Sequence, residues 1–431
     1  MNLENNLAFA KAQDAGDELK EFRSQFLFPK HNGKEFIYLC GNSLGLQPKA
    51  AKAVLEGQLD NWASYAVEGW FDGQEPWMYY HKELKKLMAP IVGANLAEVC
   101  PMNTLTVNLH LLMVSFYQPK NKRFKIIMEG GAFPSDQYAI ESQVKFHGFD
   151  PKEAIIEVFP RPGEEVLRTE DIIAKIEENG DEIALVLFGG INYYTGQWYD
   201  MERITQAGHS IGAIVGWDLA HAAGNVPVKL HDWDVDFACW CSYKYQNSGP
   251  GGISGIFVHE KHFGNKDLNR FAGWWGYQED TRFKMEKGFI PEPGADGWQV
   301  SCTQVMPMAL YHASLQIFEK AGFIEPLRNK SIALTNYLEF IVKQVNKDLN
   351  FEQYKIITPG EHKDRGAQLS IIAKEKGKRI FDGLVKNHVL VDWREPDVIR
   401  LTPIPLYNSF EDIYQTGQIL LKVSQGILNK I

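Results

Sequence analysis

An aspartate and a lysine, each following a short apolar segment, carry the strongest chemical signal in the sequence. Asp218 stands in Trp217-Asp-Leu-Ala-His-Ala222, and Lys244 stands in Cys241-Ser-Tyr-Lys-Tyr-Gln246. The interval between them has room for one loop and one strand, so both side chains can emerge at the ligand-binding edge of an α/β sheet. An isolated Asp–Lys pair is more often a structural ion pair at the end of a strand, so the pair alone does not decide between structure and chemistry.

The chemistry that needs these two residue types is that of pyridoxal-5′-phosphate (PLP). A lysine amine forms a Schiff base with the aldehyde of this cofactor. A carboxylate facing the pyridine nitrogen keeps that nitrogen protonated, so the ring can accept electrons from a carbanion. His221, three residues after Asp218, can stack on the ring or orient the carboxylate. The Asp-x-Ala-His and Ser-x-Lys contexts together favour PLP over a structural ion pair.

Three other segments contain side chains that could complete such a site. Thr104 and Thr106 open a segment with helical spacing, and a helix N-terminus can bind a phosphate. In the segment 133–136, Phe133 could cover a ring and Asp136 could bond a polar cofactor group. Arg400 could grip a substrate carboxylate with two hydrogen bonds. Taken singly, a capped helix, a turn and a surface arginine explain these segments as well.

Short apolar segments alternate with helical patterns in the middle of the chain, which is typical of a parallel sheet with crossover helices. The segments predicted as strands are 125–128, 183–188, 213–217, 236–239 and 255–258. Two helices are expected between them. Thr169 can cap the first, and the second starts near Asp200.

A chain of 431 residues is too long for one ordinary core and predicts two domains. We expect an N-terminal segment at 1–45 that packs with the small domain, a large cofactor-binding domain at 46–295 and a smaller α+β domain at 296–431. The Pro- and Gly-rich stretch 291–297 is a plausible linker. In the last domain, apolar spacing predicts a helix over 327–345, and Ser409 can cap a final helix.

Composition excludes several classes of function. The hydrophobic fraction of 45% and charged fraction of 23% indicate a soluble globular protein without a membrane span. Residues 1–26 lack the apolar core of a signal peptide. The net charge of −9 does not favour binding to nucleic acid or to anionic membranes. Cys239 and Cys241 lie in an apolar run without further metal ligands at matching spacing, so we expect buried cysteines, no metal and a cytoplasmic protein.

With these residues in view, the sequence resembles the kynureninases over most of its length, from about Tyr38 to Ser409. The stretches that carry the resemblance are Gly41-Asn-Ser-Leu-Gly-Leu-Gln-Pro48, Leu105-Thr-Val-Asn-Leu-His-Leu-Leu112, 132–142, Tyr194-Thr-Gly-Gln197, 218–225, 236–245, Thr281-Arg-Phe-Lys-Met285 and Pro405-Leu-Tyr-Asn-Ser-Phe410. The resemblance implies the PLP-dependent transferase fold of type I. That fold has a mostly parallel sheet with helices on both faces and a smaller α+β C-terminal domain.

The resemblance also implies an activity and a set of roles. The family cleaves L-kynurenine to anthranilate and L-alanine in tryptophan catabolism, as homodimers with composite active sites. Lys244, Asp218 and Tyr243 would be catalytic, and Tyr243, ionised beside the phosphate, is our candidate proton shuttle. The residues implied to bind the cofactor are Leu105, Thr106, Phe133, Pro134, Ser135, Asp136, Asp218, His221, Tyr243, Lys244, Trp274 and Cys302. Those implied to lie near the substrate are Asn42, Ser43, Trp70, Arg400 and Cys302.

Three positions depart from the animal members of that family. Gly189 stands where a serine contacts the cofactor, Trp70 where a histidine contacts the aromatic substrate, and Cys302 where an asparagine does. Two other interpretations remain. A desulfurase of the same fold would need a mobile catalytic cysteine, for which Cys302 is the candidate. A binding protein without catalysis would not need both Lys244 and Asp218.

Overall fold

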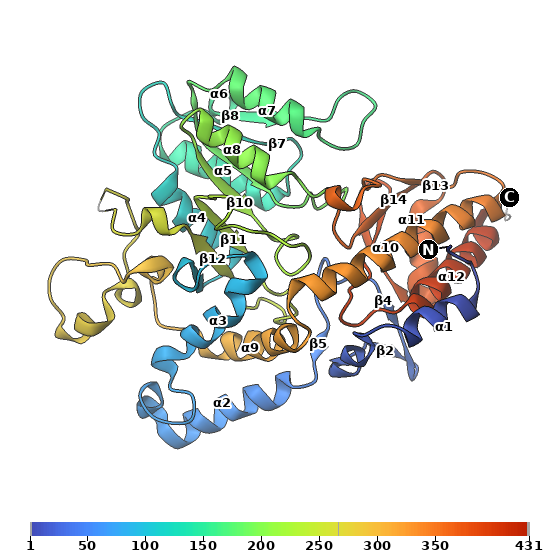
Figure 1. Ribbon diagram of the computed structural model, residues 1–431, viewed down its shortest axis with the longest axis horizontal. Helices are drawn as coiled ribbons and strands as arrows, with labels where there is room; N and C mark the ends of the chain where they lie inside the picture. The colour runs from blue at the N-terminus through green and yellow to red at the C-terminus, as the bar shows by residue number, and fades with distance from the viewer. Residues whose placement is uncertain (1, 266, 429–431) are drawn as a thin grey trace.

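A seven-stranded sheet forms the centre of the larger part of the chain (Figure 1). The computed structural model describes residues 2–265 and 267–428. The strands in spatial order are β6 (Val99–Pro101), β12 (Gly255–Val258), β11 (Phe237–Trp240), β10 (Ile214–Asp218), β9 (Ile183–Gly189), β7 (Lys125–Glu129) and β8 (Ile155–Val158). Only the pairings of β12 are antiparallel. The five predicted strands are therefore confirmed to within a residue at each end.

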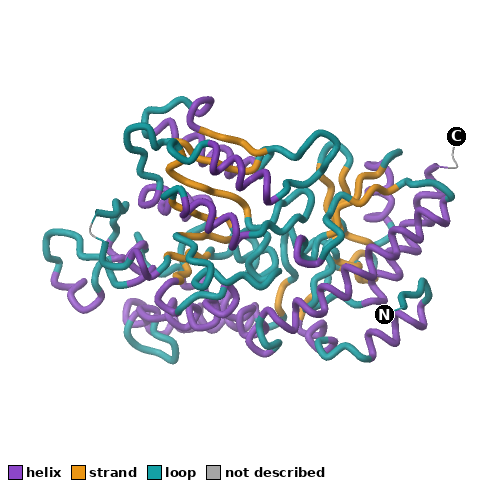
Figure 2. The backbone as a smooth tube through the Cα atoms, turned by 45° about the horizontal axis from the view of Figure 1, so that its top comes forward, coloured by secondary structure: helices purple, strands orange, loops and turns teal. Residues whose placement is uncertain are grey.

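Helices cover both faces of this sheet, as Figure 2 shows. Alternate residues of one strand point to opposite faces, and β7 illustrates this, since Ile127 and Ile126 belong to two different apolar clusters. The helices on the two faces are α3 (Tyr80–Val92), α7 (Thr169–Glu178), α8 (Met201–Ser210) and α9 (Val305–Lys320) with the first cluster, and α4 (Leu105–Phe116) and α5 (Pro134–Phe146) with the second. This arrangement agrees with the mostly parallel sheet covered by helices on both faces that the resemblance implies.

A four-stranded antiparallel sheet organises the C-terminal part. Its strands in order are β13 (Tyr354–Ile356), β14 (Leu369–Ala373), β17 (Val398–Leu401) and β16 (Asp392–Arg394). The helices α10 (Ile324–Leu349), α11 (Gly377–Lys386) and α12 (Phe410–Leu428) accompany this sheet and share an apolar cluster with it. Ser409 caps α12 as expected, since its Oγ accepts the backbone N–H of Asp412 at 3.1 Å.

The N-terminal segment lies against this C-terminal part. Helix α1 (Leu7–Ala15) contacts α12, and Ala10 is buried in the same apolar cluster. The two-residue strand β4 (Ile37–Tyr38) pairs with β15 (Val389–Leu390). Helix α9 lies after residue 296 but packs against α3 and α2 (Ala51–Tyr65). The division at residues 45 and 295 stays a prediction. The remaining short elements are β1 (Phe26–Leu27), β2 (Lys30–His31), β3 (Lys34–Glu35), β5 (Gln47–Pro48) and α6 (Pro151–Ala154).

Two local expectations are wrong. The stretch 291–297 is not an open linker, because the 3-10 turn Gly294–Trp298 is buried and Asp296 pairs with the buried Lys85. Gly294 makes this possible: its φ is +82°, and a Cβ there would lie 2.6 Å from the carbonyl oxygen of Ala97. The second correction concerns Thr169, which is the first residue of α7, while Arg168 occupies the cap position without a side-chain bond.

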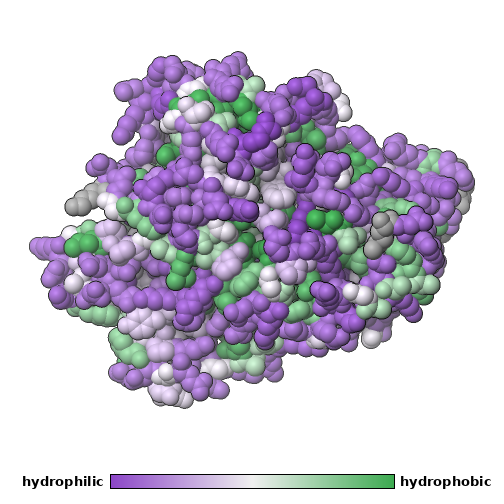
Figure 3. Space-filling view, viewed as in Figure 1, coloured by the Kyte–Doolittle hydropathy of each residue, from purple (hydrophilic) through white to green (hydrophobic). Residues whose placement is uncertain are grey.

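Hydrophilic residues predominate on the face of the molecule shown in Figure 3. None of the helices within residues 2–265 and 267–428 combines the length and apolar character that crossing a membrane requires.

Candidate active site

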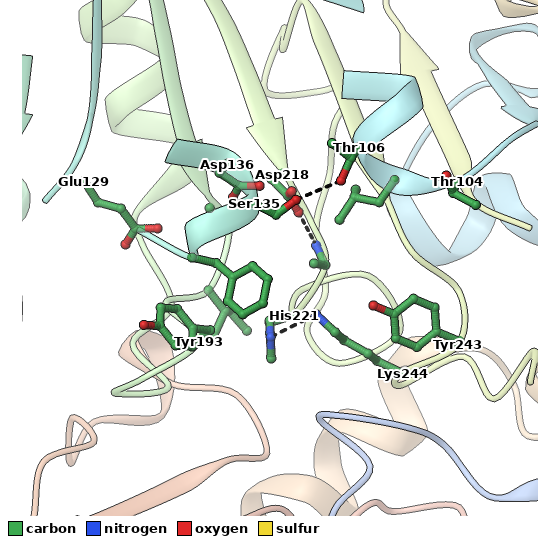
Figure 4. A pocket seen from close by; sticks show the side chains of 15 residues that line it. Thr104, Thr106, Glu129, Ser135, Asp136, Tyr193, Asp218, His221, Tyr243 and Lys244 are labelled. Atoms are coloured by element: carbon green, nitrogen blue, oxygen red, sulfur yellow. Dashed lines mark hydrogen bonds between the residues drawn. The ribbon is translucent and has the colours of Figure 1, made fainter. Parts of the chain in front are cut away.

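A cavity of about 180 Å³ opens where strands β7, β9 and β10 end (Figure 4). This is the edge at which α/β sheets bind ligands. The residues that line it are Thr104, Leu105, Thr106, Glu129, Phe133, Ser135, Asp136, Gly189, Ile191, Tyr193, Asp218, Ala220, His221, Tyr243 and Lys244. The tertiary structure therefore brings together side chains from four separate segments that the sequence singled out: 104–106, 133–136, 218–221 and 243–244.

Lys244 and His221 meet at one end of the cavity. Lys244 Nζ lies 3.2 Å from His221 Nε2, and the same Nζ lies 5.8 Å from the centre of the Phe133 ring. Burial lowers the pKa of His221 well below its usual value, and the positive charges of Lys244 and then of Arg400 and Arg394 lower it further. His221 is therefore neutral, and its Nε2 accepts a hydrogen bond from Nζ of Lys244. Its Nδ1 then carries hydrogen and has no partner among the described residues.

Asp218 is the last residue of β10 and is nearly buried. Its Oδ1 accepts the backbone N–H of Ala220 at 2.7 Å. Its Oδ2 is buried and has no hydrogen-bond donor in the described part of the chain. A buried carboxylate oxygen without a donor is costly, so this oxygen marks the place where a ligand N–H fits.

Asp136 faces Asp218 at the other end of the cavity from Lys244, as Figure 4 shows. The pKa of the Asp136 carboxyl lies well above its usual value, first because of burial and then because of the negative charge of Asp218. Burial also raises the pKa of Asp218, whereas the Ala220 N–H and the Lys244 charge lower it. Two adjacent carboxyls cannot both ionise freely. We therefore assign the proton to Asp136 and the negative charge to Asp218.

Hydroxyl groups line the side of the cavity next to helix α4. Thr106 Oγ1 and Ser135 Oγ are 2.8 Å apart, and the unpaired N–H groups of the first turn of α4 begin at Leu105. This combination suits a phosphate. Tyr243 lies close by, and burial, more than the neighbouring Cys241, raises the pKa of its phenol. Tyr243 is thus a neutral hydrogen-bond donor at pH 7 and not the ionised group that we expected.

Glu129 is a residue of the cavity that the sequence reasoning missed. It ends β7, is nearly buried, and accepts hydrogen bonds from Tyr199 Oη and from Asn192 Nδ2, the latter at 2.8 Å. Burial raises its pKa. Its Oε1 would lie 2.9 Å from a Cβ at Gly189, so the missing side chain at Gly189 leaves room for Glu129. The position of an acid at the end of a predicted strand was the signal that could have identified it.

Arg400 lies beyond Tyr193, at the boundary with the C-terminal sheet. Its Nη1 donates to the backbone oxygen of Tyr193 at 2.6 Å, and its Nη2 donates to Ser43 Oγ at 3.2 Å. Asn42 is fully buried. With its side-chain amide oriented so that the oxygen faces Arg400, this oxygen accepts hydrogen bonds from Nε and Nη2 of Arg400 at 3.3 Å each. The structure therefore brings together Asn42, Ser43 and Arg400, three residues that the resemblance places near the substrate.

Profiles of two protein families match the chain: "Kynureninase C-terminal domain" over residues 327–420 and "Aminotransferase class-V" over residues 47–274. The kynureninase of Flavobacterium johnsoniae is 55% identical over 430 residues, which is 100% of both chains. That of Christiangramia forsetii is 54% identical with the same coverage, and that of Nematostella vectensis is 50% identical over 94% of this chain and 91% of its own. The chain belongs to the kynureninase family.

More distant solved structures share the fold with this kynureninase-family chain. A cysteine desulfurase from Thermococcus onnurineus superposes with a TM-score of 0.72 at 16% identity, covering 91% of this chain and 95% of its own. The cystine C-S lyase C-DES, in complex with cysteine persulfide, superposes with a TM-score of 0.74 at 14% identity, covering 89% and 97%. At such low identity these likenesses establish the type I fold alone.

The kynureninase-family chain is a PLP-dependent enzyme, and the cavity residues fit this cofactor. The donor-free Oδ2 of Asp218 suits a protonated pyridine nitrogen, and the Nδ1–H of His221 offers a further hydrogen bond. The N-terminus of α4, with Thr106, Ser135 and the neutral Tyr243, suits the phosphate. Lys244 supplies the amine for the Schiff base.

Seven residues expected at the kynureninase site do not line the cavity: Asn42, Ser43, Trp70, Pro134, Trp274, Cys302 and Arg400. Of these, Asn42, Ser43 and Arg400 form the cluster described above, and Pro134 lies between two lining residues, Phe133 and Ser135. Trp70 packs against Trp275 with ring centres 5.3 Å apart. Trp274 is 42% exposed and donates from Nε1 to the backbone oxygen of Arg282 at 3.3 Å. Within one chain, Trp70 and Trp274 therefore pack around Trp275 and not in the cavity.

A cluster of possible metal ligands lies outside the cavity and consists of Glu98, His231 and His259. The Glu98 oxygens already accept the backbone N–H groups of Asn95 and Glu260 at 2.8 and 2.9 Å. The two imidazole rings stack 5.0 Å apart and only 9° from parallel. A histidine nitrogen binds a metal ion that lies in the plane of its ring, and two parallel stacked rings have no such position in common. We therefore interpret this cluster as a hydrogen-bonded structural group and not as a metal site.

Proposed function

We propose that the protein is a hydrolase that cleaves the Cβ–Cγ bond of L-kynurenine and gives anthranilate and L-alanine. We further propose that 3-hydroxy-L-kynurenine is a second, poorer substrate and that the protein acts in the cytoplasm as a step of tryptophan catabolism. Five free cysteines support a reducing compartment. One observation carries this activity: in a kynureninase-family chain, Lys244 and the carboxylate oxygen of Asp218 that has no hydrogen-bond donor line the same cavity.

The proposed mechanism assigns each group a task. Bound PLP withdraws electrons from the α-carbon of the amino acid. Asp218, which carries the negative charge of the Asp136–Asp218 pair, keeps the pyridine nitrogen protonated. Lys244 removes the α-proton, and the neutral His221 beside it does not add a competing positive charge. One water adds to the γ-carbonyl and forms a hydrate. The Cβ–Cγ bond of this hydrate then breaks, so that Cγ leaves as the carboxyl group of anthranilate and Cβ keeps the electron pair and takes up a proton to give L-alanine.

The remaining residues bind and orient. Thr106, Ser135 and the N-terminus of α4 hold the phosphate, and Tyr243 donates to it while also being placed to pass a proton to the product carbon. Arg400 binds the α-carboxylate of the substrate, next to Asn42 and Ser43. This arrangement needs both parts of the chain, because Arg400 comes from strand β17 of the C-terminal sheet and Lys244 from the loop that follows β11 of the central sheet.

The decisive experiment is incubation of the purified holoenzyme with L-kynurenine while anthranilate fluorescence is followed. Stoichiometric anthranilate and L-alanine support the proposal. Release of sulfide from L-cysteine without anthranilate would instead indicate a desulfurase. Such a desulfurase would need Cys302 to reach the reaction centre, and Cys302 does not line the cavity.

We also propose a homodimer, because one surface of the chain exposes many large apolar side chains. We call it the aromatic face, and its members are Leu59, Trp62, Tyr65, Val67, Phe71, Phe271, Trp274, Phe283, Met285 and Ile290, each at least 42% exposed. The contact between Phe71 and Phe283, with ring centres 6.0 Å apart, connects its two segments. An apolar patch of this kind marks an interface, and a two-fold dimer would bring Trp274 to the cavity of the partner.

A complementation experiment tests this dimer. Lys244→Ala and Trp274→Ala chains, each nearly inactive, are unfolded together and refolded as a mixture. If Trp274 serves the partner's cavity, each heterodimer has one intact site, and random pairing should restore about a quarter of wild-type activity. If Trp274 serves its own chain, no site is intact and no activity returns. Sedimentation of the wild type as an active monomer would contradict the proposal outright.

The proposed substrate preference follows from Trp70 and Cys302. Both lie outside the cavity of their own chain and, like Trp274, would meet the substrate in the partner's cavity of the proposed dimer. A tryptophan offers one N–H on a large apolar ring and a cysteine only a weak thiol, so neither bonds an added phenolic hydroxyl well. We expect wild-type kcat/KM to favour L-kynurenine over 3-hydroxy-L-kynurenine, by about 100-fold at most because apolar pockets reject a hydroxyl poorly. The Trp70→His, Cys302→Asn double variant should shift this ratio toward the hydroxylated substrate. An unchanged ratio would mean that Trp70 only packs against Trp275.

A further inference from the structure

The edge strand β16 places two charged side chains beside the carboxylate-binding Arg400. In the antiparallel pairing of β16 with β17, Asp392 lies directly opposite Arg400. Arg394 follows two residues after Asp392 and therefore points to the same face of the sheet. Side chains opposite or diagonal to one another on one face are close enough to interact. The mechanism described above uses Arg400 but assigns no task to Asp392 or Arg394.

One carboxylate oxygen of Asp392 joins the three groups. Asp392 Oδ2 accepts from Arg400 Nη2 and from Ser43 Oγ, and it lies 3.4 Å from Nη2 of Arg394. The side chains of Arg400 and Asp392 are 1% and 10% exposed, so their ion pair is buried. Arg400 therefore already has an anion at its guanidinium before any substrate carboxylate arrives.

The cluster of Arg400, Asp392 and Arg394 has a net charge of one positive unit. A buried guanidinium without a counter-ion is strongly unfavourable, and Asp392 supplies that counter-ion. Arg394 is 37% exposed, and its Nε has no partner among the described residues. Two guanidinium groups and one carboxylate leave one net positive charge, which the single α-carboxylate of an amino acid neutralises.

The positive charge of Arg394 also reaches the cavity. Among the causes that lower the pKa of His221, burial is the largest and Lys244 the second, and the charges of Arg400 and Arg394 follow. Tyr193 provides the structural connection, because it lines the cavity and its backbone oxygen accepts from Arg400.

We propose that Asp392 and Arg394 complete the carboxylate-binding site. Asp392 is a positioning residue that keeps Arg400 in an ion pair in the free enzyme. When the substrate carboxylate binds Arg400, Arg394 becomes the main ion-pair partner of Asp392. The proposal rests on the proposed function in one respect, namely that Arg400 binds the substrate's carboxylate. It predicts that Asp392 and Arg394 contribute to the preference of this site for an α-amino acid over its amide.

The experiment uses holoenzyme titrated with L-alanine or L-alaninamide, with the visible cofactor band as the readout. The variants are Arg394→Met, Asp392→Asn and their combination. Arg379→Met is the control, since it removes the same charge from an exposed site on α11. Arg394→Met should weaken L-alanine binding by about 10-fold, as loss of a charged partner does, with little effect on the amide. The control should change neither.

The two remaining variants separate electrostatics from mere support of the fold. Asp392→Asn leaves an unneutralised Arg400, so 0.1 M acetate should compete with L-alanine several-fold more strongly than in the wild type. The combined variant again has one net positive charge and should bind L-alanine at least about threefold more tightly than Arg394→Met alone. Three outcomes would each overturn the proposal. The first is a combined variant whose loss of L-alanine affinity is the product of the losses of the two single variants. The second is an equal loss of affinity for L-alanine and L-alaninamide in Arg394→Met, and the third is acetate competition in Asp392→Asn that is unchanged from the wild type.

Two readouts keep failures apart. Thermal melts and the visible band of each variant show whether the chain folds and carries its cofactor, and a variant that fails this is replaced by Arg394→Gln or Asp392→Ser. A wild type that prefers L-alanine to its amide but releases no anthranilate from L-kynurenine would defeat the proposed function and leave this inference standing. A wild type that binds acid and amide equally would defeat the inference.

Discussion

Replacing Lys244 by alanine is expected to lower anthranilate release from L-kynurenine by more than about 10³-fold, because the variant loses both the Schiff-base amine and the base for the α-proton. The position of the amine supports this expectation. Lys244 lines the cavity, and its Nζ lies 3.2 Å from the neutral His221. Lys145→Ala is the matched control, because Lys145 is a lysine of α5 with its side chain 62% exposed.

The same lysine should carry the cofactor covalently. The purified wild-type protein should be yellow, and borohydride should fix the cofactor on Lys244 in a form that survives digestion and peptide mapping. A label on another lysine, or anthranilate release from Lys244→Ala at a rate near that of the control, would end the assignment of Lys244.

Replacing Asp218 by asparagine is expected to leave PLP bound but to lower kcat/KM for L-kynurenine by about 100-fold or more. The physical reason is the charge of the Oδ2 oxygen, which has no donor in the described protein and is placed to keep the pyridine nitrogen protonated. An amide at this position cannot stabilise that proton. Cofactor binding is measured from the visible band and the rate from anthranilate fluorescence.

Asp136→Asn provides the comparison for this prediction. Because burial and the Asp218 charge keep Asp136 protonated, an asparagine there changes no charge, and its loss of activity should be smaller than that of Asp218→Asn. A rate for Asp218→Asn within about tenfold of wild type, equivalent to 1.4 kcal/mol of barrier, would show that Asp218 is not the electron-sink partner. Equal losses in both variants would contradict the assignment of the proton to Asp136.

The sequence alone predicted five of the seven strands of the central sheet and the residues at the ends of two of them, but it missed β6 and β8. Alternating apolar segments and helical spacing depend on local periodicity, which is why β7, β9, β10, β11 and β12 appeared where expected. Asp218 and Lys244 stood out because each follows such a strand. The buried turn at 294–298 was missed, because composition alone does not distinguish a Gly- and Pro-rich turn inside the molecule from a linker on its surface.

Protonation states and charge partners were decided only by the tertiary structure. The pKa values of Asp136, Tyr243 and His221 depend on burial and on neighbours brought in from distant segments, which no local pattern reveals. Glu129 was missed although it directly follows a predicted strand, and its place next to Gly189 became visible only through the pairing of β7 with β9.

The residue types and their spacing therefore determined which chemistry this chain can perform, because PLP catalysis requires a lysine and a carboxylate at the edge of a sheet. The tertiary structure decided which of these groups carry charge and which side chains belong to the cavity. It placed Trp70, Trp274 and Cys302 outside the cavity of their own chain, and it placed Asp392 against Arg400 through the register of two short strands. Charge and contact depend on distances between atoms far apart in the sequence, and only the folded chain sets those distances.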